Sequence, residues 1–177
     1  MSQTIYAYIS DGGIQEEISQ GAGRIAGHLG LDNLIMYYDA NNIQLSTTVE
    51  EVDSEDVAAK YKAWGWHVIE IDGCCPEAIR KALREAKATV GQPTLIIGKT
   101  IMGRGAVGPN GENYENRVNT HGQPLSAAGA SIEATIKNLG GDPEAPFQIF
   151  PDVQELYAAR LQELRELAKA RKQEEKT

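Results

Sequence analysis

The chain has 177 residues, enough for one domain with a sizeable hydrophobic core. Its 25 acidic and 17 basic residues give a formal net charge of −8, which argues against a nucleic-acid partner because nucleic-acid backbones are bound by clustered Lys and Arg. No apolar run approaches the roughly 18 residues that span a bilayer, and no charged-then-apolar leader opens the chain, so we expect a cytoplasmic protein without a membrane partner.

Apolar runs and helical stretches alternate over the first hundred residues. Strands are predicted over residues 5–9, 34–38, 67–72 and 94–98. Helices are predicted over residues 14–29, ended by Gly30, over 55–63, which Ser54 is placed to cap, and from Pro76 to about Thr89. Because near-continuously apolar strands separated by helices are typical of parallel sheets, the pattern indicates an α/β fold: a parallel sheet flanked by helices on both faces.

The remainder of the chain is less regular. Residues 101–126 carry five glycines without periodicity and predict a long loop, a kind of segment that tends to be functional or mobile. Helices are predicted over residues 127–139 and from Asp152 to about Lys172, the second ending in a charged, solvated stretch. We therefore expect an α/β domain over residues 1–141 and a helical extension over residues 142–177 that leads toward a following domain.

Two strand ends carry residues of the kind that bind a phosphate and a cation. The first strand runs into Ser10-Asp11-Gly12-Gly13 and the second, about thirty residues later, into Asp39-Ala40-Asn41-Asn42-Ile43. Glycine lets backbone N–H groups approach a phosphate, while carboxylate and amide oxygens suit a divalent cation that carries a diphosphate. Ligands of parallel sheets bind beyond the carboxyl ends of strands, where Asp11, Asn41 and Thr100 fall.

These residues also have ordinary structural interpretations. Asp11 is equally suited to cap the helix that follows it, and Asn41 and Asn42 suit a turn with a left-handed backbone. His121, in a glycine-rich loop, is on its own typical of a surface histidine. Found together at two strand ends of one sheet, Asp11 and Asn41 favour the ligand interpretation.

Four segments, in the right order, resemble the transketolase family, whose enzymes use thiamine diphosphate. The segments are Tyr6 to Ser19, Leu34 to Ile43, Lys99-Thr100-Ile101-Met102-Gly103-Arg104-Gly105 and Thr120-His121-Gly122-Gln123-Pro124-Leu125. Four ordered matches are specific, whereas an Asp-Gly with a distant Asn is weak evidence alone. The resemblance covers most of the chain and weakens after about Gly141.

The resemblance implies a cofactor site at the two strand ends. The Asp11 carboxylate, the Asn41 side chain and the Ile43 carbonyl would hold Mg²⁺, and the cofactor diphosphate would complete its coordination. The backbone N–H of Gly12 would donate to that diphosphate. His121 would lie beside it and assist proton transfer.

Further positions take their expected roles from the same resemblance. Met102 and Leu45 would pack near the thiazolium ring, and Glu16 would join an acidic network across a dimer interface. Three positions depart from the family pattern: Ser10 replaces a common Gly, Gly21 an acidic residue and Val118 a histidine. None of the three is an expected cation ligand.

Complete transketolases hold the cofactor between a diphosphate domain and a pyrimidine-binding domain of another subunit. The chain has no counterpart of the second domain, so we expect the diphosphate-binding piece of a transketolase, either cut from a longer protein or one half of a split enzyme. When complete, this enzyme would be a homo-oligomer that transfers a two-carbon ketol unit between sugar phosphates, and the chain alone would be inactive. Two alternatives are part of another thiamine diphosphate enzyme, of the deoxyxylulose phosphate synthase or 2-oxo acid dehydrogenase type, and a non-catalytic cofactor-binding or assembly module.

Overall fold

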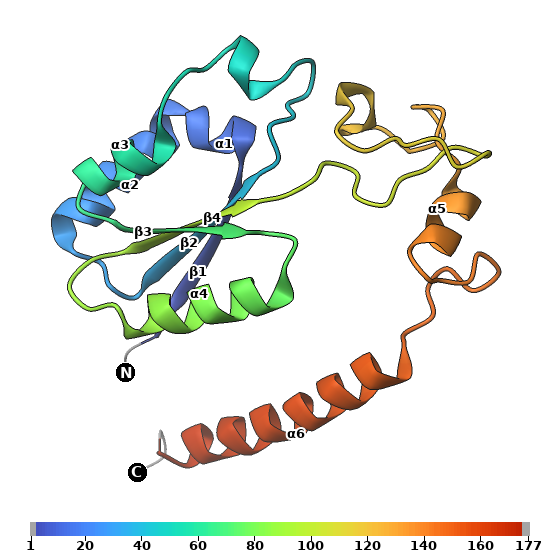
Figure 1. The fold of residues 1–177 in the computed structure, drawn as a ribbon. Helices are drawn as coiled ribbons and strands as arrows, with labels where there is room; N and C mark the ends of the chain where they lie inside the picture. The colour runs from blue at the N-terminus through green and yellow to red at the C-terminus, as the bar shows by residue number, and fades with distance from the viewer. Residues whose placement is uncertain (1–2, 175–177) are drawn as a thin grey trace. The chain divides into compact units, whose positions relative to one another are not determined.

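The structure is a computed structural model that describes residues 3–174 (Figure 1). The chain divides into two compact units, Met1–Thr135 and Ile136–Thr177, which are described separately. Among the described residues, no helix is both long and apolar enough to cross a membrane.

The first unit contains an alternation of strands and helices. Its elements, in chain order, are β1 (Ile5–Ser10), α1 (Asp11–Gln15), α2 (Glu17–Leu29), β2 (Leu34–Ala40), the 3₁₀ helix η1 (Val49–Glu51), α3 (Val57–Ala63), β3 (His67–Asp72), α4 (Pro76–Ala88) and β4 (Thr94–Lys99). Within residues 3–174 the strands form one sheet in the order β1-β2-β4-β3, and every pair is parallel. The predicted α/β fold is confirmed.

Each face of the sheet carries its own apolar layer, and helices cover both. On one face, α1, α2 and α3 pack over a cluster of Ile14, Ala26, Tyr38, Tyr61, Trp66, Leu95 and Ile97. On the other face, α4 buries Ala82 and Ala86 against Ile35 and Ile96 (Figure 1). The near-continuous apolar runs of β2 and β4 follow from this burial on both sides.

The register of the strands sets the position of the predicted site. Ser10 pairs with Asp39 across β1 and β2, and Ala40 pairs with Lys99 across β2 and β4. The residues that follow these pairs therefore leave the sheet at one edge, beyond the carboxyl ends of the three strands. Asp11, Asn41 and Thr100 reach this edge, as predicted.

Two details of the predicted helices in this unit are wrong. The helix expected over residues 14–29 is two helices, α1 and α2, because Glu16 has an extended backbone (φ −64°, ψ 131°) that separates them. The residue that caps α3 is Asp56, not Ser54: its Oδ1 atom accepts the N–H of Ala59 at 2.8 Å. The carboxylate of Asp56 also interacts favourably with the positive end of the α3 helix dipole.

The segment after β4 is a long loop, as predicted, and it folds back on itself. Tyr114 N donates to the Ala106 carbonyl at 3.0 Å, and Asn116 N donates to the Met102 carbonyl at 2.9 Å. A short 3₁₀ helix, η2, spans Val118–Thr120. These contacts give the loop a local framework in which Ala106 is buried.

The helices near the end of the chain differ in how well the sequence predicted them. The helix expected over residues 127–139 is shorter: α5 spans Ile132–Asn138, because the backbone turns at Gly129 (φ 92°) and Ser131 Oγ caps the helix by accepting the N–H of Ala134 at 3.1 Å. The last predicted helix is confirmed as α6 (Pro151–Glu174).

Candidate functional site

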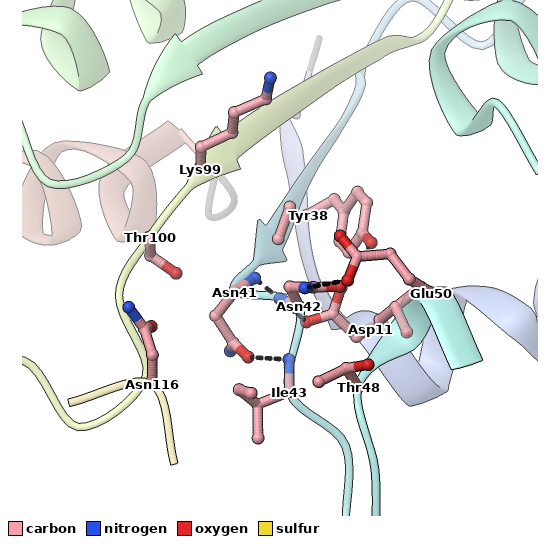
Figure 2. Close-up of a pocket in the computed structure, with 12 residues that line it drawn as sticks. Asp11, Tyr38, Asn41, Asn42, Ile43, Thr48, Glu50, Lys99, Thr100 and Asn116 are labelled. Atoms are coloured by element: carbon pink, nitrogen blue, oxygen red, sulfur yellow. Dashed lines mark hydrogen bonds between the residues drawn. The ribbon is translucent and has the colours of Figure 1, made fainter. Parts of the chain in front are cut away.

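A cavity of about 600 Å³ opens beyond the carboxyl ends of β1, β2 and β4 (Figure 2). It brings together the three predicted cation ligands, Asp11, Asn41 and Ile43. The other lining residues are Tyr38, Ala40, Asn42, Thr48, Val49, Glu50, Lys99, Thr100 and Asn116. Figure 2 shows the Lys99 ammonium group pointing away from Asp11 and Asn41, so the groups nearest Asp11 are neutral or acidic.

The Asp11 carboxylate is held by three hydrogen bonds. Its Oδ1 atom accepts the Tyr38 hydroxyl at 2.6 Å, and its Oδ2 atom accepts the backbone N–H groups of Asn41 and Asn42, each at 3.1 Å. The residue is only 2% exposed. The capping interpretation is not supported, since α1 has no side-chain cap bond and Asp11 forms its first residue. Asp11 instead joins the end of β1 to the end of β2.

Burial also sets the electrostatics of this carboxylate. Desolvation raises the pKa of Asp11, and the hydrogen bonds from Tyr38, Asn41 and Asn42 oppose that shift. Burial and the neighbouring Asp11 carboxylate raise the pKa of Tyr38, so its hydroxyl remains a donor. A buried carboxylate whose charged form is disfavoured gains from a nearby cation.

The turn after β2 carries two further candidate ligand oxygens, Asn41 Oδ1 and the Ile43 carbonyl oxygen. Asn41 Oδ1 accepts the N–H of Ile43 at 3.0 Å, which fixes the side chain over the turn. Asn42 has a left-handed backbone (φ 66°), as the turn interpretation expected. Its side chain donates to Glu50 Oε2 at 3.0 Å, and its carbonyl accepts the N–H of Val49 at 3.1 Å. The Ile43 carbonyl accepts no hydrogen bond from any residue that the structure describes.

The donor set suits one hard cation. Over residues 3–174, no group of three or more His, Cys, Asp or Glu side chains is placed to hold a metal ion. A cation in this cavity would therefore depend on one carboxylate, one amide oxygen and one backbone carbonyl. Mg²⁺ accepts such a mixed oxygen set when water or phosphate oxygens complete its octahedron.

The sequence and the fold of the chain are similar to those of known proteins. The family described as "Transketolase, thiamine diphosphate binding domain" matches residues 1–176. The chain belongs to the transketolase family. It is 40% identical over 156 residues to "Transketolase 2" of Xanthobacter flavus, covering 88% of this chain and 22% of that protein. It is 42% identical over 154 residues to "Transketolase 2" of Vibrio vulnificus, covering 86% and 21%.

Solved transketolases share the fold. The transketolase from Leishmania mexicana superposes with a TM-score of 0.84 at 32% identity, over 94% of this chain and 24% of that one. The transketolase from Campylobacter jejuni gives 0.81 at 34% identity, over 94% and 25%. The chain thus spans a fifth to a quarter of the length of the transketolases that it resembles.

Five residues predicted from the transketolase resemblance do not line the cavity: Gly12, Glu16, Leu45, Met102 and His121. Gly12 is exposed in the first turn of α1, and Glu16 is exposed at the break between α1 and α2. The Met102 carbonyl accepts the N–H of Asn116, a lining residue, at 2.9 Å.

His121 is half-buried and directly follows η2 in the loop after β4. Its Nδ1 atom is buried and has no hydrogen-bond partner among the described residues. The following residue, Gly122, packs beside Leu45: a methyl group on Gly122 would lie 3.4 Å from Leu45 Cδ1. Gly122 therefore lies near Leu45, two residues after Ile43, and an unpartnered buried nitrogen on the preceding His121 suits a ligand.

Sequence reasoning missed the residues that support the site. The sequence pattern places Tyr38 only in an apolar strand, although a buried tyrosine usually needs a partner for its hydroxyl, and that requirement is the available signal. Asp39 belongs to the strand-end motif, but the sequence assigns it no role. It accepts hydrogen bonds from Tyr8, at 2.5 Å, and from Thr100, and so ties the ends of three strands together. Nothing in the local sequence indicated Asn116 or Glu50.

Proposed function

We propose that this chain is the part of a transketolase that holds the diphosphate of thiamine diphosphate through Mg²⁺. The observation that carries the proposal is the convergence of Asp11, Asn41 and Ile43 at one cavity beyond the ends of β1 and β2. These three residues supply the oxygens for the cation. The family description supports the cofactor, and the donor set supports the metal.

The charge of the cavity lining favours a bound cation over a bound anion. Asp11 and Glu50 are the acidic residues at the cavity, and the Lys99 ammonium group points away from Asp11. A diphosphate would meet unfavourable charge here without a divalent cation between them. Mg²⁺ joins the two, because it binds carboxylate and phosphate oxygens together.

Other residues of the chain complete the proposed site. The N–H of Gly12, in the first turn of α1, donates to the diphosphate, and His121 offers its unpartnered nitrogen from the neighbouring loop. Leu45, exposed beside Gly122, and Met102 provide apolar contact for the thiazolium ring. Glu16 contributes to the subunit interface. Thiamine diphosphate supplies the reactive carbon and the electron sink of the transfer reaction when it is bound.

The complete enzyme transfers a two-carbon ketol unit between sugar phosphates, as a homo-oligomer, and the chain alone is inactive. The support is the family match, and the chain spans 22% of the length of the Xanthobacter flavus protein. Residues 1–141 form the diphosphate-binding domain, and residues 142–177 extend toward the next domain. An assay with a pentose phosphate pair, using protein free of host transketolase, should show no turnover, and measurable turnover would contradict this part of the proposal.

Calorimetric titration tests the binding function. The wild-type chain should bind thiamine diphosphate weakly and only when Mg²⁺ is present. Asp11→Ala should abolish the Mg²⁺-dependent heat, while Asp152→Ala, which removes an exposed carboxylate from α6, should leave it unchanged. Equal binding by wild-type chain and Asp11→Ala would remove Asp11 from the site.

A further inference from the structure

The Asp11 carboxylate has a definite number of free acceptor sites. An ionised carboxylate offers about four lone-pair sites, two on each oxygen. The N–H groups of Asn41 and Asn42 occupy both sites of Oδ2, each at 3.1 Å. The Tyr38 hydroxyl occupies one site of Oδ1 at 2.6 Å. One acceptor site therefore remains, on Oδ1.

The Tyr38 hydroxyl has little freedom to leave this position. Tyr38 is 6% exposed and belongs to the apolar cluster under α1, α2 and α3. Its ring stands on β2, one residue before Asp39, whose register against Ser10 fixes the distance to the end of β1. The packed core thus determines where the hydroxyl lies, and the hydroxyl determines how the carboxylate plane turns.

We propose that Tyr38 is a positioning residue for the cation site. By taking one site of Oδ1, it directs the remaining site toward the cavity, so that a cation binds Asp11 through Oδ1 alone. Bidentate binding is prevented because Oδ2 is saturated by the two backbone donors. This inference rests on the proposed function, since it needs a cation at Asp11.

The chain offers a matched control for the loss of a buried hydroxyl. Tyr61 is fully buried in the same cluster as Tyr38, and its hydroxyl has no hydrogen-bond partner among the described residues. Tyr38→Phe and Tyr61→Phe therefore make the same chemical change in the same core. Only the first breaks a hydrogen bond to Asp11.

Amide hydrogen exchange of the metal-free chain, followed by NMR, gives the first comparison. In Tyr38→Phe the carboxylate is free to turn, so the amides of Asn41 and Asn42 should exchange about tenfold faster than in the wild-type chain. In Tyr61→Phe they should exchange at the wild-type rate. Unchanged exchange in Tyr38→Phe, or equal acceleration in both variants, would overturn the proposal.

Binding of Mn²⁺ alone, measured by water-proton relaxation, gives the second comparison. Tyr38→Phe should bind Mn²⁺ about tenfold more weakly than the wild-type chain and carry a different number of waters on each bound ion, while Tyr61→Phe should match the wild type. The same affinity and hydration in Tyr38→Phe would also overturn the proposal. If the wild-type chain binds no Mn²⁺, the proposed function fails, and the exchange comparison still decides whether Tyr38 holds the carboxylate.

Discussion

Asn41 donates its backbone N–H to the Oδ2 atom of Asp11 at 3.1 Å, although 30 residues separate them in the sequence. The contact joins the turn after β2 to the first residue of α1. The same carboxylate serves the N–H of Asn42 and the hydroxyl of Tyr38. The Asp11 side chain therefore has two roles: it links the end of β1 to the turn after β2 by hydrogen bonds, and it places a negative charge at the site.

The two contributions of Asp11 should separate in two substitutions. Asp11→Ala leaves one buried donor, on Tyr38, and the two part-buried N–H groups of Asn41 and Asn42 without their acceptor, and should lower the free energy of unfolding by about 2 to 4 kcal/mol. Asp11→Asn keeps an acceptor for the backbone N–H groups, removes the buried charge and should retain the stability of the metal-free chain. Urea unfolding at neutral pH measures both. Equal destabilisation by the two substitutions would show that the charge, not the acceptor, stabilises this region.

The raised pKa of Asp11 gives a direction for the pH dependence of the metal-free chain. Burial raises the pKa of Asp11 above its usual value of 3.8. At pH values between 3.8 and the folded-state pKa, the folded chain therefore holds a proton on Asp11 that the unfolded chain has released. The part of the stability that depends on protonation of Asp11 is therefore fully present below pH 3.8 and is lost as the pH rises through the folded-state pKa. Asp11→Asn should remove this fall. A fall of the same size in both proteins, in unfolding experiments across that range, would exclude Asp11 as its cause.

The left-handed backbone of Asn42 should limit what can replace it. A β-branched residue is strained at φ 66°, so Asn42→Val should cost about 2 kcal/mol of folding stability and weaken cofactor binding by displacing the turn that carries Ile43. Asn42→Gly relieves the strain while losing the bond to Glu50, so its stability should lie within about 1 kcal/mol of the wild type. Thermal unfolding with and without cofactor measures the stabilities of both variants. Equal stability of Asn42→Val and Asn42→Gly would contradict the prediction.

Two glycines of α2 should respond in opposite ways to the same substitution. A methyl group on Gly27 would lie 1.9 Å from the backbone oxygen of Trp64, so Gly27→Ala must separate α2 from the end of α3 and should destabilise the chain by about 2 to 4 kcal/mol. Gly21 has no atom within 4 Å of that position, and Gly21→Ala should stabilise the helix by roughly 0.5 to 1 kcal/mol. Denaturant unfolding measures the change in the free energy of unfolding for both substitutions. A change in the same direction for both would contradict the described packing of α2.

Strand positions could be predicted from the sequence because the sheet is buried on both faces. The apolar runs at residues 34–38 and 94–98 match β2 and β4 to within two residues at each end. Parallel strands then place their carboxyl ends at one edge, which was sufficient to bring Asp11 and Asn41 together. Helix ends were predicted less well, because the break at Glu16 and the caps at Asp56 and Ser131 depend on the backbone of one or two residues.

Long-range hydrogen bonds were the part of the site that the sequence could not predict. Tyr38 and Asp11 are 27 residues apart, and their contact depends on the register of β1 against β2 and on how the core holds the tyrosine ring. Likewise, Asn116 reaches the cavity only through the fold of the loop after β4, where its N–H meets the Met102 carbonyl. Such contacts follow from packing and not from any local pattern.

The most direct test of a cation site at Asp11 is anomalous diffraction from crystals of the chain grown with Mn²⁺ and thiamine diphosphate. The account predicts one anomalous peak in the cavity, about 2 Å from Asp11 Oδ1, Asn41 Oδ1 and the Ile43 carbonyl oxygen, with diphosphate density on its open side. A peak elsewhere on the chain, or diphosphate density in the cavity with no metal between it and Asp11, would contradict the account.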